Sequence, residues 1–274
     1  MTIPELCNLL EIPTEVTDKV ITHERNIDFN ALQKELESIQ TPKPELWEKA
    51  INSMKEILAP DEDGMRILTC QLYCVLDTYE NYIKRGISKA IFIDTMKFFS
   101  RFLQEYKDRH GRFCYVWAWW VPRQISMVEF RIGSLEYEMK TNNGKSIIDL
   151  HIPADAEMTM CSLRESYLNA RKFIKTFFPE FKEADMVCSS WLLSPSLQNL
   201  LTENSRILQF QKSFEIGQSE ENHLGFMDWV YGRRDIPIEK LPENTSLQKK
   251  LKPYLLNNGQ IEWTFGKLID DPFV

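Results

Sequence analysis

The sequence predicts an α+β fold, with a helical first part followed by a mixed β-sheet that has flanking helices. Up to about residue 113, apolar residues recur at spacings of three and four, which is typical of amphipathic helices. Beyond that point, short alternating runs read as strands, and helical runs interrupt them. We therefore expect a helical domain over residues 1–113 and a sheet domain over residues 114–274.

Residues that begin and end helices divide the helical part. Proline stands in the first turn of three amphipathic runs, at positions 4, 13 and 44, where its missing N–H costs nothing. Asp61 is expected to cap a helix that ends at Gly86, and Ser88 a second helix that ends at Gly111. The aromatic segment 115–122 fits neither period, and we interpret it as a buried junction, with stacking on a ligand as the alternative.

The second part begins as an antiparallel meander. The alternation changes phase at Gly133–Ser134, which indicates a turn or bulge, and Asn142–Gly144 is a strong type I′ hairpin signal. Proline at 153 then ends the third strand. In chain order we expect strands at 128–132, 135–139 and 146–152, a helix at 162–178, a strand at 185–193, a helix capped by Ser194, a strand at 208–216, a helix at 246–257 and a strand at 261–265.

Composition excludes several classes of protein. The chain has 274 residues, of which 43% are hydrophobic and 27% charged, as in an ordinary globular protein. A net charge of −7 argues against nucleic-acid or anionic-membrane partners, which require a basic surface. The chain shows neither a signal peptide nor an apolar run of ~20 residues, so we expect a cytoplasmic protein. Six cysteines lack zinc-binding spacing, so no metal is expected. The oligomeric state stays open.

Seven short motifs in order carry a resemblance to a known family. They are Gly86–Ile87, Asp94–Met96, Trp119–Trp120, Phe130–Glu138, His151–Ala154, Ser190–Leu193 and Leu241–Gln248. Together they resemble a bacterial two-domain acyltransferase-like family, with a helical N-acyltransferase N-terminal domain and a GNAT-like C-terminal domain. The resemblance implies a GNAT-like mixed sheet and the transfer of an acyl group from acyl-CoA or acetyl-CoA to a small-molecule or peptide amine.

Two departures from the family pattern favour an alternative, a non-catalytic GNAT-like module that binds a ligand or a partner. Where the family has histidine and aspartate around the central strand, this chain has Ser189 and Ser194. The segment 154–162, which precedes the helix expected to hold the CoA diphosphate, contains no glycine. Glycine there lets the backbone approach a phosphate closely, although a bare helix N-terminus also attracts anions.

Candidate catalytic residues follow from the strand that ends at Pro153. Asp149 and His151 are two residues apart, so they share a face, and a carboxylate beside an imidazole can deprotonate an amine. The alternative for His151 is a structural histidine at the edge of the core. Glu136 and Glu138 also share a face of their strand. They either bind a cationic acceptor or, as we expect, lie on a solvated face.

Candidate cofactor-binding residues follow from the resemblance. It implies that strands 146–152 and 185–193 splay apart around pantetheine, with Ser162, Arg164, Ser190 and Trp191 at the acyl-CoA. Ser162 also has the Ser-x-x-Glu spacing of a helix capping box. Arg164, together with Arg171 and Lys172, faces the CoA phosphates or is plain helix surface. Cys188 is expected to be a core thiol rather than a nucleophile.

Overall fold

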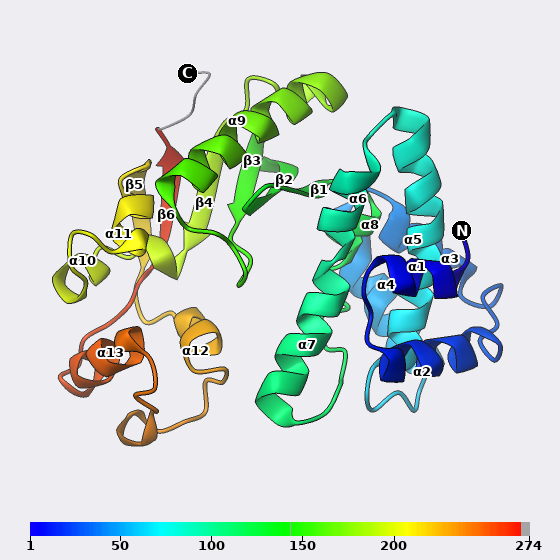
Figure 1. Cartoon of the computed structure of the whole chain (residues 1–274), viewed down its shortest axis with the longest axis horizontal. Coiled ribbons are helices and arrows are strands. Elements are labelled where there is room, and N and C mark those ends of the chain that lie inside the picture. The colour runs from blue at the N-terminus through cyan, green and yellow to red at the C-terminus, as the bar shows by residue number, and fades with distance from the viewer. Residues whose placement is uncertain (143, 270–274) are drawn as a thin grey trace. The chain divides into compact units, whose positions relative to one another are not determined.

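The computed structural model describes residues 1–142 and 144–269. The chain forms two compact units, Met1–Ile132 and Gly133–Val274. The first is helical and the second is built on a β-sheet, as the sequence predicts (Figure 1). We describe each unit by itself.

The first unit consists of helices and one short strand. Its elements are α1 (Ile3–Leu9), α2 (Thr14–Glu24), α3 (Gln33–Gln40), α4 (Pro44–Ile57), α5 (Met65–Arg85), α6 (Lys89–Met96), α7 (Phe98–His110), α8 (Pro122–Ile125) and β1 (Glu129–Ile132). The long helix α5 buries side chains over its whole length and lies at the centre of this unit.

The expected helix ends are confirmed, with one difference. The Asp61 carboxylate accepts the backbone N–H groups of the first turn of α5, and Gly86 ends that helix at φ 72°. The Ser88 hydroxyl caps α6. The single helix expected from Ser88 to Gly111 is instead two, because the backbone departs from regular helical geometry at Lys97, where ψ is −6°. A straight helix buries only one stripe of side chains along its length. Here the residues directly before and after Lys97, Met96 and Phe98, are both buried.

The segment after Gly111 contacts the helices of the first unit. The Tyr115 N–H donates to the Asp63 carbonyl oxygen at 2.8 Å, and its hydroxyl donates to Gln71 at 2.5 Å. The Gln71 amide in turn donates to the Ala118 carbonyl at 2.8 Å. Division of the chain after residue 113 would assign this segment to the second part, but its hydrogen bonds extend the helical unit. Trp119 is half exposed, so the junction is not buried throughout.

The second unit alternates strands and helices in nearly the expected order. Its elements are β2 (Leu135–Asn142), β3 (Lys145–His151), α9 (Met160–Phe177), β4 (Asp185–Ser190), the 3₁₀ helix η2 (Trp191–Leu193), α10 (Leu197–Leu200), α11 (Arg206–Gln211), β5 (Phe214–Glu220), α12 (Gly225–Val230), α13 (Ser246–Leu256) and β6 (Trp263–Leu268). Two further 3₁₀ turns are η1 (Pro179–Phe181) and η3 (Ile238–Lys240).

The strands of this unit form a mixed sheet in the order β2-β3-β4-β6-β5. β3 and β4 are parallel, and the other neighbouring pairs are antiparallel. The last strand, β6, is inserted between β4 and β5. Asn142 pairs with Lys145, so the predicted hairpin has a two-residue loop, of which Asn143 lies outside the described residues and Gly144 has φ 79°.

Three expected elements differ in the structure. The central strand ends at Ser190 rather than at residue 193, because the chain turns into η2. Ser194 does not cap the next helix, since α10 begins at Leu197. Leu208 and Phe210 lie on helix α11, and the strand begins only at Phe214. Two apolar residues two apart do not separate a strand from a short helix.

No helix among residues 1–142 and 144–269 is long and apolar enough to span a membrane.

Candidate active site

The parallel strands β3 and β4 separate at one end. They pair from Ile147 with Asp185 to Asp149 with Val187. Past this last pair, β3 continues for two residues to His151, and β4 continues for three to Ser190. β4 remains paired with β6 over this stretch, so its unpaired edge is the one toward β3. The pairing of β3 with β4 thus ends before either strand does, as the splay implied by the resemblance requires, and His151 is the last residue of β3.

The two faces of the sheet differ in character. Tyr137 points to the face that α9 covers, where its hydroxyl lies 2.8 Å from the Ser166 hydroxyl (Figure 1). The alternate residues Glu136 and Glu138 point to the opposite face. In the β2–β3 register they stand across from His151 and Asp149, and cross-strand partners share a face.

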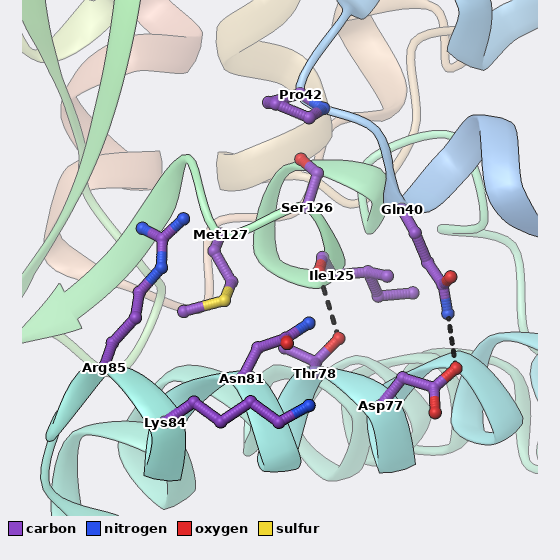
Figure 2. Close-up of a pocket in the computed structure, with 10 residues that line it drawn as sticks. All are labelled: Gln40, Pro42, Asp77, Thr78, Asn81, Lys84, Arg85, Ile125, Ser126 and Met127. Carbon is purple, nitrogen blue, oxygen red and sulfur yellow. Dashed lines mark hydrogen bonds between the residues drawn. The ribbon is translucent and has the colours of Figure 1, made fainter.

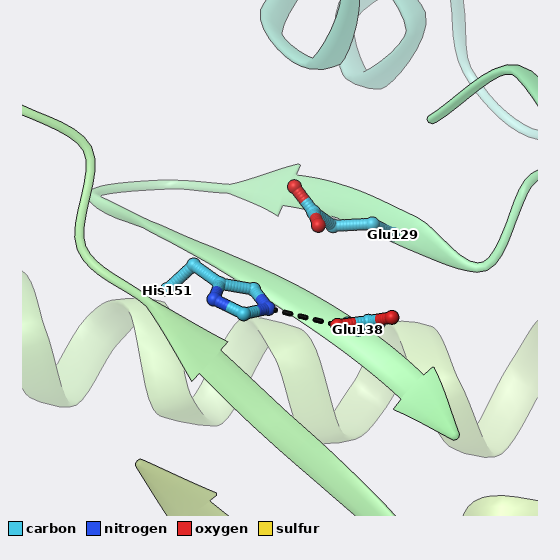
Figure 3. Close-up of side chains that lie close together, drawn as sticks. All are labelled: Glu129, Glu138 and His151. Carbon is cyan, nitrogen blue, oxygen red and sulfur yellow. Dashed lines mark hydrogen bonds and ion pairs between the residues drawn. The ribbon is translucent and has the colours of Figure 1, made fainter. Parts of the chain in front are cut away.

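One partner of His151 is Glu138. The ring Nε2 lies 3.0 Å from Glu138 Oε2, and Figure 3 shows this contact running between the two strands. The Glu138 side chain is 4% exposed, whereas that of His151 is 22% exposed. A nearly buried carboxylate thus holds one ring nitrogen of a histidine that remains accessible.

Asp149 lies on the same face as His151, as the sequence predicts, but its partner is different. Its carboxylate accepts a hydrogen bond from Lys140, whose ammonium is also 3.8 Å from Glu138. The expected Asp149–His151 pair is therefore replaced by a Glu138–His151 contact. The solvated face expected for Glu136 and Glu138 is also wrong, since both are buried. Sequence alternation gives the shared face, but not which side chains meet across the strands.

Helix α9 begins two residues earlier than expected. Thr159 caps it, and the Ser162 N–H donates to Thr159 Oγ1 at 3.3 Å. Ser162 is thus the third helical residue, with its amide already bonded. The Glu157 carboxylate also lies at this helix end, where it accepts the Thr159 N–H at 3.2 Å and pairs with Arg206. A negative charge therefore stands beside the N–H groups that a diphosphate would approach.

The other candidate cofactor-binding residues lie at two places. Arg164 is exposed on the early turns of α9. Ser190 ends β4, and its hydroxyl accepts the Leu192 N–H at 3.1 Å. Trp191 is 8% exposed and packs in an apolar cluster with residues of α10, α12 and α13. Ser190 and Trp191 shape the turn at the open end of β4.

Arg171 and Cys188 have structural surroundings. Arg171 is buried, and its guanidinium donates to the Ala184 carbonyl at 2.8 Å, so it joins α9 to the start of β4. Cys188 is fully buried, and this burial, with Asp149 nearby, raises the pKa of its thiol well above the usual value. A thiol that stays protonated is a poor nucleophile, as expected for a core cysteine.

Sequence reasoning missed Glu262. Its carboxylate accepts hydrogen bonds from Ser194 and, at 2.7 Å, from Ser196. Burial raises the pKa of this carboxyl, but the hydroxyl groups of Ser194 and Ser196 outweigh burial, so the net shift is downward. The family pattern has aspartate where Ser194 stands. Here the nearby carboxylate is that of Glu262, which directly precedes β6 and lies 68 residues further along the chain.

Known protein families match both parts of the chain. Residues 129–268 match the GNAT-like C-terminal domain, and residues 1–127 match the N-acyltransferase N-terminal domain. The chain therefore belongs to the family of two-domain N-acyltransferases, and the family resemblance seen in its motifs is confirmed.

Solved structures share the fold over nearly the whole chain. A mutant acyltransferase in complex with octanoyl-CoA has a TM-score of 0.79 at 20% identity, over 96% of this chain and 86% of that one. An acyltransferase in complex with decanoyl-CoA and teicoplanin has a TM-score of 0.77 at 22% identity, over 96% and 87%. A complex with CoA and 10C-teicoplanin gives 0.78 at 21% identity, over 96% and 86%. Among curated protein sequences, none matched significantly.

Proposed function

We propose that this protein is an N-acyltransferase that moves an acyl group from a CoA thioester to an amine. The observation that carries the proposal is the opening between β3 and β4 with His151 at its mouth. Strand ends that stop pairing present peptide groups toward the opening, and an extended amide chain such as pantetheine can pair with them. The structural relatives that bind octanoyl-CoA, decanoyl-CoA or CoA support the same donor class.

In the proposed reaction, the acceptor amine attacks the thioester carbonyl carbon directly. A C–N bond forms and the C–S bond breaks, so the products are an amide and CoA thiolate. His151 removes the proton that the attacking nitrogen loses, and that proton is the one the thiolate finally needs. Backbone N–H groups at the opening stabilise the negative charge that develops on the carbonyl oxygen. Proximity of the two reactants supplies much of the rate.

Glu138 serves as a positioning residue in this scheme. A buried carboxylate that accepts a hydrogen bond from the Nε2–H group keeps the ring in one tautomer. The basic lone pair of that tautomer is on Nδ1. Asp149 is paired with Lys140 and so balances charge on this face of the sheet. It does not contact the proton that His151 removes from the amine.

For the CoA diphosphate we propose the N-terminal end of α9, with Arg164 and the amide groups of the first turn. The positive end of the helix dipole favours an anion there. Glu157 and the glycine-free segment before the helix oppose it. We therefore expect a modest affinity, with a Kd of roughly 10 μM to 1 mM for acyl-CoA.

The acceptor is proposed to be a small molecule that carries a primary amine. Two of the structural relatives are acyltransferases in complex with teicoplanin or 10C-teicoplanin, which supports a small-molecule acceptor.

The test follows the transfer of the acyl group and the release of CoA. Purified protein is incubated with acetyl-, octanoyl- or decanoyl-CoA and a panel of small amines, and the acylated products are identified by mass spectrometry. His151→Gln is expected to lower kcat/KM by about 10²–10⁴ while acyl-CoA binding persists. His110→Gln, at the end of α7, is the matched control and should keep full activity.

One result would contradict the proposed activity, and another would contradict the role of His151. If no acyl-CoA binds at millimolar concentration, the protein is a non-catalytic GNAT-like module. If His151→Gln keeps full activity, or only lowers the melting temperature, the base must be sought at Glu136 or Glu138.

A further inference from the structure

The helical unit contains a cavity of about 310 Å³ between α5 and the turn at residues 125–127 (Figure 2). Polar groups of its walls are bonded to one another. The Thr78 hydroxyl donates to the Ile125 carbonyl at 3.0 Å, and the Gln40 amide approaches the Asp77 carboxylate at 3.4 Å. Contacts within the chain therefore account for this cavity. In the sheet unit, such contacts account for only one ring nitrogen of a second histidine, His223.

His223 lies between β5 and α12, where the backbone and a tryptophan hold its ring. Its Nδ1 accepts the Gly225 N–H at 3.0 Å, so the neutral ring carries its proton on Nε2. The centroid of the ring lies 4.6 Å from that of Trp263, the first residue of β6. A Cβ at residue 225 would come within 2.6 Å of the imidazole, so the glycine leaves the space that the ring occupies. The ring is thus fixed, and it is only partly buried.

A helix cap is the simpler explanation of His223. The hydrogen bond to Nδ1 satisfies the Gly225 N–H, which belongs to the first turn of α12, and the ring packs on Trp263. This explanation covers Nδ1 and the ring face, but not Nε2. Among residues 1–142 and 144–269, the Nε2–H group has no hydrogen-bond acceptor. It is therefore an oriented donor that remains available to a bound molecule.

The topology places His223 at the same end of the sheet as His151. β3, β4 and β5 run in one direction and β6 in the other, so the first three strands end where β6 begins. α12 follows β5 beyond this end of the sheet (Figure 1). Trp263, which contacts His223, shares its face of β6 with Phe265.

An exposed face of the sheet connects Phe265 to His151. Phe265 is 40% exposed, and it pairs with Ser189, which is also exposed. Ser189 shares its face of β4 with Val187, which pairs with Asp149. Asp149 in turn shares its face of β3 with His151. Two strand spacings, about 10 Å, separate β3 from β6. A small molecule laid across β4 therefore spans the distance between the two histidine-bearing ends of this face.

The side chains of this face limit the kind of molecule that fits. Glu220 is exposed and pairs with Trp263, and Glu138 and Asp149 lie on the same face of β2 and β3. Carboxylates attract an ammonium group and repel an anion. The exposed ring of Phe265 offers an apolar surface. These features fit an amine whose body carries an apolar ring and a neutral oxygen, such as a hydroxyl or carbonyl oxygen.

We propose that His223 determines specificity for the acceptor, by donating a hydrogen bond from Nε2–H to a neutral oxygen on the body of the amine. This inference rests on the proposed acyl transfer. The amino group of the acceptor lies at His151, and the rest of the molecule crosses Ser189 and Phe265 toward His223. One neutral hydrogen bond of this kind changes affinity about fivefold.

Two substitutions separate the roles of the two ring nitrogens. His223→Asn keeps an acceptor near the position of Nδ1, and so keeps the cap, but it has no group at the position of Nε2. His223→Gln reaches the position of Nε2 with an N–H donor, but caps the helix less well. If capping is the whole role of the residue, His223→Asn behaves like the wild type. His110→Asn, at the end of α7, is the control.

The probes are tyramine and phenethylamine, two amines that differ only by a phenolic hydroxyl. Their binding to the full chain is followed by NMR through the indole N–H signal of Trp263. We expect tyramine to bind about fivefold more tightly than phenethylamine, with a Kd of roughly 1–10 mM. This preference should vanish in His223→Asn and persist in His223→Gln and His110→Asn.

Acyl transfer from octanoyl-CoA to the same amines is measured separately. His223→Asn should raise the KM for tyramine about fivefold at unchanged kcat, which the loss of a helix cap would not do. If no transfer occurs but the tyramine preference depends on His223, the proposed activity fails and the binding role of His223 stands.

Three results would overturn the role of His223. The first is that neither amine shifts the Trp263 signal at roughly 0.1 M, or that both bind equally. The second is that His223→Asn keeps the preference for tyramine. The third is that both His223 variants lose the preference together with a lowered melting temperature, since the residue then acts only through the fold.

Discussion

His151 and Glu138 meet diagonally across β2 and β3, with Nε2 and Oε2 3.0 Å apart. The register places Glu136 directly opposite His151, and Glu138 one step along the same face. The imidazole therefore leans along the strands toward the more buried of the two carboxylates. An ionised Glu138 at this position favours the neutral tautomer that carries its proton on Nε2.

Glu138→Gln is the first test of this relationship. We expect kcat/KM to fall by about 10–10², with the KM for acyl-CoA unchanged, because the ring loses the charge that selects its tautomer. Nitrogen-15 NMR of labelled histidine should show the Nε2–H tautomer in the wild type and a mixture in the variant. Glu180→Gln, on the exposed turn after α9, is the control. Full activity together with a mixed tautomer would exclude a positioning role.

The second prediction concerns Glu157 at the start of α9. Its carboxylate stands beside the helix N-terminus that is proposed to hold the CoA diphosphate, and like charges repel there. Glu157→Gln should tighten acyl-CoA binding about three- to tenfold, with the larger gain at low salt. Calorimetry at two ionic strengths measures this. An unchanged Kd at both salt concentrations would place the diphosphate elsewhere.

The sequence predicts local features better than pairings. Helix caps such as Asp61 and Ser88 depend on neighbours a few residues away, and the structure confirms both. The Asn142–Gly144 hairpin is equally local. The Glu138–His151 contact depends on cross-strand register, which alternation alone does not specify. The Ser194–Glu262 contact joins positions 68 apart, so no local pattern contains it.

The third prediction concerns Asp185, where β4 begins. Hydrogen bonds from Lys145, at 2.5 Å, and Lys267, at 2.9 Å, lower the pKa of its carboxyl below 3.8. A carboxyl whose pKa is lower in the folded than in the unfolded state stabilises the protein at pH values above its unfolded-state pKa. This stabilisation is lost as the pH falls through the folded-state pKa. Because both lysines are largely exposed, Asp185→Asn should cost only about 0.5–1 kcal/mol at pH 7.

Urea unfolding of the wild type and Asp185→Asn at pH 7, 5 and 3 measures this difference. The free energies of unfolding of the two proteins should converge as the pH falls below 3.8, the ordinary pKa of an aspartate carboxyl. A difference that is constant with pH would show that the substitution acts through packing and not through the carboxylate charge.

The last prediction restores the family's aspartate at position 194. Ser194 is fully buried, and its hydroxyl donates to the Glu262 carboxylate. Ser194→Asp would replace this hydrogen bond by two carboxylates in contact, which cannot both stay ionised without a large penalty. We expect it to lower the free energy of unfolding by roughly 2–3 kcal/mol more than Ser194→Asn, which has the same size without the charge.

Glu262→Gln should remove that excess cost. In its background, Ser194→Asp and Ser194→Asn should be about equally stable, because the amide can donate to the new carboxylate. A double-mutant cycle from urea unfolding at pH 7 measures the coupling, which should exceed about 1 kcal/mol. At pH 4 the coupling should shrink, since the two carboxylates can then share a proton. Additive effects at pH 7 would show that Ser194→Asp destabilises the protein by steric conflict and not by charge repulsion. Glu262 would then not take the place of the family's aspartate.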